Sequence, residues 1–140
     1  MKILVAVDGS PYTKRMLGYL AAHDEWLGAQ NTFTVLTVVP AVVPRAAAVL
    51  AKDVLKAHYE EEAEKVLKPI RSFLAKKGLP VEFVSKTGAA AEVIAALADK
   101  GRYDILMMGS HGHGSLRNLV LGSVATRVLA QCSTPVLLVR

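Results

Sequence analysis

The sequence predicts an α/β domain of three layers (α/β/α), in which helices cover both faces of a mostly parallel sheet. Apolar runs that suit strands alternate with helical stripes from one end of the chain to the other. Hydrophobic residues make up 52% of the 140 residues and aromatic residues only 6%, so the core is expected to be aliphatic, as in sheets buried on both faces. No repeat, low-complexity stretch or linker interrupts residues 1–140, and we expect a single domain.

The first half of the chain opens with a continuous apolar run at 2–7 (KILVAV), which is typical of a buried central strand. Ser10 follows as an N-cap with proline beside it, and Gly28 ends the helical pattern that they begin. The β-branched run Thr32–Val39 predicts the second strand. Two prolines and the lack of a clear period predict a loop over Pro40–Ala48.

A long helix comes next, because apolar residues recur every three or four positions from Leu55 to Leu74. Pro69 falls inside this pattern and is expected to kink or split the helix, which Gly78 ends. The alternating segment Pro80–Ser85 then predicts an outer strand.

Four further elements complete the order. A helical stripe runs from Val93 to Ala98 and ends near Gly101, and Tyr103–Met108 predicts the fourth strand. Ser123–Gln131 predicts the last helix and Pro135–Arg140 the last strand. Strands that alternate with helices in this way require right-handed crossovers.

A stretch rich in glycine, MGSHGHGSLRNLVLGS at 108–123, joins the fourth strand to the last helix. In parallel sheets, ligands bind outside the carboxyl ends of the strands, at the point where the strand order reverses. Asp8 follows the first strand and Val38 lies near the end of the second. These three pieces of sequence can therefore converge on one crevice.

The residue types in this stretch favour a nucleotide as the ligand. Gly109 and Gly112 allow the backbone to approach an anion closely, and Gly122 with Ser123 offers free N–H groups and a hydroxyl at a helix start. Ser123 reads equally well as a simple N-cap. Asp8 would repel phosphate and is better placed on the sugar or base side, unless it is only a turn residue.

Several familiar sites are absent from the sequence. A dinucleotide fingerprint would need glycine at 117, where Arg117 stands, and there is neither a Walker-type P-loop nor the Gly-x-Ser-x-Gly elbow of α/β-hydrolases. His111 and His113 lack the further ligands that a zinc site needs, so no metal site in the protein is expected. No catalytic set is assembled, and we do not expect an efficient enzyme.

The spacing Gly109-x2-Gly112-x9-Gly122-Ser123 resembles the nucleotide-binding motif of the universal stress proteins, in the subgroup that binds ATP. The likeness extends over ILVAVDGS, GAAAEVIAALADKGRYDILMMGSHG and GSVATRVLAQCSTPVLLVR, but not over the loop after Pro40 or the acidic helix. It implies a five-stranded parallel sheet of order 3-2-1-4-5, the adenine nucleotide alpha hydrolase-like fold. It also implies a homodimer through Pro135–Arg140, whose apolar run would otherwise be an exposed edge.

The resemblance also implies which residues bind the nucleotide. On the adenine and ribose side they are Ala6, Val7, Asp8 and Val38, and around the ribose and phosphates they are Met108, Gly109, Gly112, Gly122, Ser123 and Val124. The implied ligand is ATP, with Mg or Mn on its phosphates as in some relatives. His113 stands where many ATP-binding relatives carry Arg or Lys, and Arg117 could supply the missing charge. We include His111 in the site, although its simpler interpretation is a hydrogen bond that orders the loop.

These observations predict an ATP-binding, dimeric sensor or regulator of a stress response, with an unidentified protein partner. Two alternatives stay open: a slow ATPase or self-phosphorylating protein with Ser110, Ser115 or Ser123 as acceptor, and a nucleotide-free dimeric interaction module. The net charge of +5 is too spread out for a nucleic-acid partner. No segment has the roughly 20 apolar residues of a membrane helix. The single cysteine, Cys132, which reads as a small buried hydrophobe, favours a cytoplasmic location.

Overall fold

A computed structural model of the chain describes residues 1–114 and 118–140. Its strands form one parallel sheet in the order β3-β2-β1-β4-β5. The strands are β1 (Lys2–Ala6), β2 (Thr32–Val39), β3 (Val81–Thr87), β4 (Ile105–Gly109) and β5 (Val136–Val139). The strand order that the resemblance implied is therefore confirmed.

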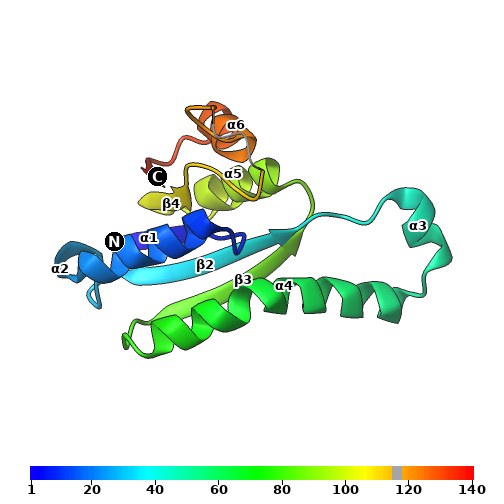
Figure 1. Cartoon of the computed structure of the whole chain (residues 1–140), viewed down its shortest axis with the longest axis horizontal. Coiled ribbons are helices and arrows are strands. Elements are labelled where there is room, and N and C mark those ends of the chain that lie inside the picture. Colours follow the sequence, from blue (N-terminus) through cyan, green and yellow to red (C-terminus); the bar gives the residue numbers. More distant parts are fainter. Residues whose placement is uncertain (115–117) are drawn as a thin grey trace.

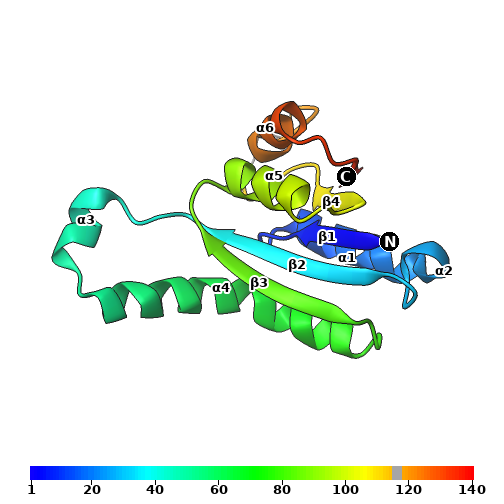
Figure 2. The same ribbon diagram turned by 180° about the vertical axis from the view of Figure 1, so that it is seen from behind.

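Helices cover both faces of the sheet, as Figures 1 and 2 show. Helices α1 (Pro11–Ala22) and α4 (Lys52–Ala75) pack on one face, and α5 (Ala90–Lys100) and α6 (Ser123–Gln131) pack on the other. The short α2 (Asp24–Leu27) follows α1, and α3 (Pro44–Val49) stands on an arm that projects from the layers. The predicted three-layer architecture is confirmed.

The central strands are apolar on both sides because each side faces a separate core. Ile3 and Val5 of β1 point into the core beneath α1 and α4, whereas Leu4 and Ala6 point into the core beneath α5 and α6. All four side chains are buried. Side chains alternate across a strand, so a run without polar residues is what a doubly covered strand requires.

The expectation of a loop over Pro40–Ala48 is wrong, because α3 forms at Pro44–Val49. Pro44 lies in the first turn, where the missing N–H of proline costs nothing. Three alanines follow, and alanine has the highest helix propensity. The sequence before Pro44 has no helical pattern and stays irregular.

The first helix ends earlier than Gly28, the predicted stop. Helix α1 ends at Ala22, and His23 takes a non-helical conformation before α2 begins. Gly28 follows α2, and a Cβ atom there would lie 1.9 Å from the carbonyl oxygen of Asp24. Only glycine allows the chain to turn this close to the preceding backbone.

Pro69 does not split the long helix. Helix α4 runs without interruption from Lys52 to Ala75, and Gly78 lies in the turn beyond its end, with φ +65°. Leu67 and Ile70 are both buried in the core on either side of the proline. The packing of this face offsets the hydrogen bond that a proline removes.

Asp99 at the end of α5 holds the connection between α6 and β5. Its carboxylate accepts hydrogen bonds from the amides of Ser133 and Thr134 at 3.0–3.1 Å and from the Thr134 hydroxyl at 2.8 Å. The bond from the Ser133 amide, followed by the Thr134 hydroxyl, lowers the pKa of Asp99 below its usual value. The start of β5 is thereby fixed against α5.

Cys132 was expected to be a buried residue of the last helix, and this is wrong. It is the C-cap that follows α6, it is only partly buried, and its thiol lies 3.5 Å from Asp99 Oδ1. Burial still raises the pKa of the thiol. Among the described residues, no helix combines the length and the apolar character that crossing a bilayer demands.

Candidate functional site

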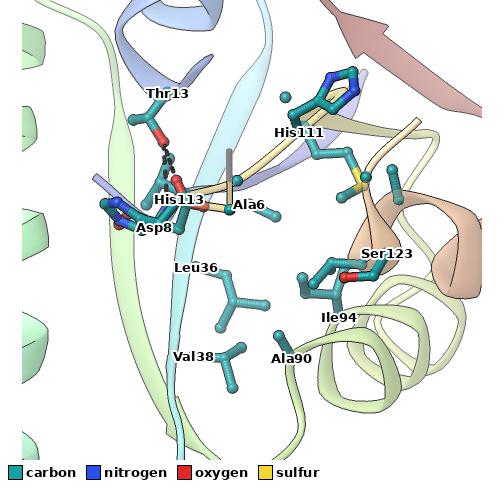
Figure 3. A pocket seen from close by; sticks show the side chains of 18 of the residues that line it. Ala6, Asp8, Thr13, Leu36, Val38, Ala90, Ile94, His111, His113 and Ser123 are labelled. Atoms are coloured by element: carbon teal, nitrogen blue, oxygen red, sulfur yellow. Dashed lines mark hydrogen bonds between the residues drawn. The ribbon is translucent and has the colours of Figure 1, made fainter. Parts of the chain in front are cut away.

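A pocket of about 290 Å³ opens at the carboxyl edge of the sheet. The chain passes from β1 outward to β2 and β3 and then returns to β4 on the other side of β1, so the strand order reverses at this edge. Figure 3 shows an apolar wall formed by side chains of β1, β2 and α5: Ala6, Leu36, Val38, Ala90 and Ile94. Met108 of β4 also lines the pocket. This part of the pocket suits a flat apolar group such as a nucleobase.

Asp8 follows β1 and is held at the rim by the first turn of α1. Its Oδ1 accepts a hydrogen bond from the Ser10 amide at 2.9 Å. Thr13 makes two bonds with the same residue: its hydroxyl donates to Asp8 Oδ1 at 3.0 Å, and the Asp8 amide donates to Thr13 Oγ1 at 3.1 Å (Figure 3). The other oxygen, Oδ2, receives no hydrogen bond from the described residues. One oxygen therefore fixes the carboxylate, and the other is available to a donor in the pocket.

Ser10 occupies the predicted N-cap position of α1, but its side chain makes no capping bond. Its hydroxyl is buried and has no partner among the described residues. Thr13 takes its place in the interaction with Asp8. The pair Ser10 and Pro11 therefore sets the backbone entry of the helix, and Thr13 orients the functional carboxylate.

The glycines of the loop are needed because backbone segments cross closely. A Cβ on Gly109 would lie 2.7 Å from Tyr12 Cβ, one on Gly112 would lie 2.8 Å from Asp8 Oδ2, and one on Gly122 would lie 3.0 Å from His111 Cα. None of these three has a positive φ. Part of the glycine density thus serves the internal packing of the loop, and the absence of side chains also leaves the pocket open.

His111 ties the loop together. Its Nε2 lies 2.8 Å from the carbonyl oxygen of Leu119, which can only accept, so Nε2 carries the proton in the neutral ring. Nδ1 then accepts from the Ser110 hydroxyl at 2.9 Å. Both ring nitrogens are committed, which agrees with the interpretation of His111 as a residue that orders the loop.

Ser110 connects the loop to the edge of the sheet. Its amide donates to the carbonyl of Val139 in β5, and its own carbonyl accepts from the amide of Gly122, both at 2.8 Å. The residue is fully buried. The start of α6 is therefore fixed relative to the last strand.

His113 closes the loop over the end of β1. Its Nε2 donates to the carbonyl oxygen of Asp8 at 2.6 Å, and the side chain is exposed at the rim. No lysine or arginine lines the pocket among the described residues. The described lining therefore carries no permanent positive charge that could balance an anion.

The start of α6 faces the pocket. Gly122 is the N-cap, so the expectation that Ser123 could be the N-cap is wrong: Ser123 is the first helical residue. No side chain caps this helix, and both Ser123 and Val124 line the pocket. The N–H groups of the first turn and the Ser123 hydroxyl are available to an anion.

The pocket brings together every predicted site residue that the structure describes. They are Ala6, Val7, Asp8, Val38, Met108, Gly109, His111, Gly112, His113, Gly122, Ser123 and Val124. Arg117 lies outside the described residues, as does Ser115. The geometry shows that these residues share a pocket; which ligand they bind is a separate question.

Sequence reasoning missed several lining residues. Thr13 carried a signal, since a hydroxyl in the first helical turn after an aspartate is placed to hold it. Leu36 lies two residues before Val38 and so shares its face of β2. Ala90 and Ile94 lie four apart on α5, and only the register of α5 over the sheet shows that they reach the pocket.

The family model that matches this chain is that of the universal stress protein family, and the match covers residues 1–140. Universal stress protein Slr1230 of Synechocystis sp. is 34% identical over 139 residues, which are 99% of this chain and 42% of that protein. A universal stress protein of Thermus aquaticus is 34% identical over 144 residues, which cover 99% of this chain and 97% of that protein. This chain therefore spans less than half of the Synechocystis relative.

Solved structures share the fold. That of MJ0577, a protein of Methanocaldococcus jannaschii, has a TM-score of 0.81 at 28% identity and covers 99% of this chain and 94% of its own. A universal stress protein in complex with cAMP has a TM-score of 0.65 at 20% identity, and the match covers 100% of this chain and 96% of that chain. One from Arabidopsis thaliana with AMP bound has a TM-score of 0.70 at 17% identity and covers 99% and 90%. One from Archaeoglobus fulgidus in complex with dAMP has a TM-score of 0.69 at 23% identity and covers 100% and 98%. At identities this low, the last three show likeness of fold alone.

Proposed function

The chain belongs to the universal stress protein family, and we propose that its pocket binds an adenine nucleotide, with ATP as the first candidate. The loaded protein would act in the cytoplasm as a dimeric regulator in a stress response and would not be an efficient enzyme. One observation carries this proposal: three features meet in one pocket. They are an apolar wall, the Asp8 carboxylate with only one oxygen hydrogen-bonded to the protein, and the N-terminus of α6, which no side chain caps. Related proteins of the same fold hold AMP, cAMP or dAMP.

Each part of an adenine nucleotide has a matching part of the pocket. The base would lie on the wall formed by residues such as Val38 and Ile94, which are apolar and offer dispersion contacts. The ribose hydroxyls would donate to Asp8 Oδ2, the oxygen that the fold leaves available. The phosphates would meet the first turn of α6 and the Ser123 hydroxyl, where the helix dipole favours anions by about 0.3–1 kcal/mol.

The charge of the pocket bears on the phosphates. ATP carries several negative charges, and the described lining holds no lysine or arginine to balance them. Mg²⁺ or Mn²⁺ bound to the phosphates would supply part of that balance. Among the described residues, no group of three His, Cys, Asp or Glu side chains is placed to hold a metal by itself. A cation would therefore enter with the nucleotide.

The dimer would form through β5. This strand ends the sheet, its four residues Val136–Val139 are apolar and each is only partly buried. An exposed apolar edge favours pairing with another strand. A second copy of β5, lying antiparallel across a two-fold axis, would satisfy the outer backbone groups of both.

A slow ATPase or self-phosphorylating protein is the second candidate, because the Ser123 hydroxyl lines the pocket. Ser110 is a poor acceptor, since it is fully buried and its hydroxyl donates to His111. Efficient phosphoryl transfer also needs a positioned base and charged clamps. Turnover of ATP no faster than in a protein-free control would remove this candidate.

Calorimetric titration of Mg-ATP into nucleotide-stripped protein tests the main proposal. We expect saturable binding of about one ATP per chain with micromolar affinity, about −8 kcal/mol. Gly122→Ala should weaken binding at least about tenfold, because its Cβ would meet the backbone of His111 at 3.0 Å and displace the loop. Gly18→Ala is the matched control, since a Cβ at this position in α1 meets nothing within 4 Å and the residue does not line the pocket.

Two results would overturn the proposal. One is the absence of binding at millimolar ATP in both calorimetry and a fluorescence assay, which would leave a nucleotide-free interaction module as the better description. The other is equal affinity in the wild type and in a folded Gly122→Ala variant, which would place the nucleotide elsewhere. Thermal unfolding of each variant establishes that it is folded.

A further inference from the structure

We propose that Thr13 is a positioning residue that makes the pocket selective for a ligand whose sugar carries hydroxyl groups. The inference rests on the proposed binding of an adenine nucleotide and goes beyond it, because it assigns the choice of sugar to a residue that acts through Asp8. Three observations carry it: the hydrogen bonds between Thr13 and Asp8, the burial of Thr13, and the position of the carboxylate oxygen that faces the loop.

Thr13 and Asp8 exchange two hydrogen bonds (Figure 3). The Thr13 hydroxyl donates to Asp8 Oδ1 at 3.0 Å and accepts from the Asp8 amide at 3.1 Å. A hydroxyl can fill both roles at once, because it has one hydrogen and two lone pairs. This one group therefore ties both the side chain and the backbone of Asp8 to the first turn of α1.

Among the described residues, Thr13 is the only one whose side chain bonds the Asp8 carboxylate. The other bond to Oδ1, at 2.9 Å, comes from the backbone amide of Ser10, whose own hydroxyl has no partner in the described part of the chain. The terminal torsion of an aspartate is intrinsically broad, so one donor leaves the carboxylate able to turn. Two donors from different residues hold it in one orientation.

The burial of Thr13 makes this arrangement independent of a ligand. The residue is only 4% exposed, so water does not compete for its hydroxyl. Its branched Cβ also restricts the rotamers that it can adopt in a helix. The Asp8 carboxylate is therefore oriented before any ligand enters the pocket.

The oxygen left for a ligand, Asp8 Oδ2, faces the glycine loop. A Cβ on Gly112 would lie 2.8 Å from this oxygen, and both residues line the pocket. The Ser10 amide and the Thr13 hydroxyl occupy the two lone pairs of Oδ1. Oδ2 is thus the oxygen of this carboxylate that can accept a hydrogen bond from a ligand.

A carboxylate oxygen in this position selects hydroxyl donors. It accepts from a sugar hydroxyl, whereas a sugar without hydroxyls leaves the charged oxygen without a partner. Hydrogen bonds to charged groups are stronger than those between neutral groups, so the difference in affinity is measurable. If binding had first to order the carboxylate, the cost in side-chain entropy would offset this gain. Removing the Thr13 hydroxyl should therefore reduce the selectivity.

Calorimetric titrations of ATP and of 2′,3′-dideoxy-ATP, both with magnesium, test this inference. The wild type should bind ATP at least about tenfold more tightly than the dideoxy analogue, which lacks both ribose hydroxyls. Thr13→Val keeps the shape of the side chain without its hydroxyl and should reduce this ratio to less than about threefold. Thr13→Ser retains the hydroxyl and should keep the ratio of the wild type.

Thr34→Val is the matched control, because it also replaces a buried threonine whose hydroxyl is hydrogen-bonded. Thr34 lies in β2, where it accepts from the Tyr103 hydroxyl at 2.9 Å, and it does not line the pocket. This variant should keep the affinity ratio of the wild type even where its melting temperature falls. All titrations are run well below the unfolding midpoint of each variant.

Three-bond NMR couplings of Asp8 in the ligand-free protein provide a second readout, which a general loss of stability does not change. We expect one side-chain rotamer in the wild type and in Thr13→Ser, and averaging between rotamers in Thr13→Val. A single rotamer in Thr13→Val would overturn the inference, and so would a ratio in that variant equal to the wild-type ratio. Equal affinity of the wild type for both nucleotides would remove this inference alone, whereas binding of neither would remove the proposed function with it.

Discussion

Among single residues, Asp8 shows how the pocket divides its polar groups between structure and ligand. Thr13 and the Ser10 amide engage Oδ1, and Oδ2 is left for the pocket. His113 is similar, since its Nε2 donates to the backbone of Asp8 while the ring stays exposed at the rim. A ligand that enters the pocket therefore meets polar groups that the fold already holds in place.

His113→Lys should raise affinity for ATP about two- to fivefold and affinity for AMP less. A permanent positive charge at the rim attracts the additional charges of a triphosphate, and an exposed pair of this kind contributes about 0.2–1 kcal/mol. Calorimetric titrations of both nucleotides at low and physiological salt would measure the difference.

His113→Gln is the control for that experiment, because it keeps a hydrogen-bond donor near Asp8 without a charge. Its ratio of ATP to AMP affinity should match the wild type at neutral pH. An increase for glutamine equal to that for lysine would show that the charge is not the cause.

Single residues of the site could be predicted from the sequence where a short motif carried them. The glycines, Asp8 and Ser123 stand at strand ends or helix starts, and the sequence shows those places directly. Ala90 and Ile94 could not be found this way, because they reach the pocket only through the packing of α5 on the sheet. The predicted contribution of Arg117 stays a prediction.

At the scale of secondary structure, the sequence predicted which helices and strands form better than it predicted the residues at which they end. The second strand at Thr32–Val39 and the last helix at Ser123–Gln131 were predicted with their observed bounds. The stop at Gly28 was wrong because His23 breaks α1 locally, and a lone residue of that kind has no strong sequence signal. Pro69 does not divide α4, because tertiary packing decides whether a proline splits a helix; the expected kink stays a prediction.

Asp99→Asn should lower the melting temperature at pH 7 by loosening the connection between α6 and β5. The folded protein holds the pKa of Asp99 below its usual value of 3.8, chiefly through the Ser133 amide. The carboxylate therefore stabilises the fold at pH values above 3.8, and this contribution is lost as the pH falls through the lowered folded-state pKa.

Thermal unfolding between pH 7 and pH 2 would measure the effect. The difference in melting temperature between wild type and Asp99→Asn should be constant above pH 5 and shrink as the pH falls below about 3.8, the usual value. Asp104→Asn is the control: Asp104 immediately precedes β4, and its side chain accepts one hydrogen bond from the Lys2 amide. A difference that grew on acidification would contradict the assignment.

Across the whole molecule, the parallel sheet separates the pocket from the exposed edge strand. The pocket lies at the carboxyl ends of the strands, whereas β5 and β3 form the lateral edges. The four residues of β5 are apolar and partly buried. Variants in the pocket and variants at the β5 edge therefore test the two proposals separately.

Val136→Pro should convert a dimer that pairs through β5 into monomers while leaving the fold intact. The carbonyls of Pro135 and Val139 accept bonds from β4, so the backbone groups of Val136 and Leu138 point to the outer edge. A proline at 136 removes an outward N–H and no bond of the ladder to β4.

Val136→Ala is the matched control, because it trims the same side chain but keeps the N–H, and it should stay a dimer if β5 pairs. Sedimentation velocity of the wild type, Val136→Pro and Val136→Ala measures the mass of each. Monomers of the Val136→Ala variant under these conditions would contradict pairing through the strand.

The position of Cys132 makes the connection between α6 and β5 open to direct observation. The chain has one thiol, so any thiol reagent marks a single place. That thiol is partly covered, has a raised pKa and contacts Asp99, so little reactive thiolate exists while the connection is closed. The rate at which a thiol reagent labels Cys132 in the unmodified protein thus reports how often this connection opens. Measured with and without nucleotide, or at different protein concentrations, that rate would show whether either one changes the stability of the start of β5.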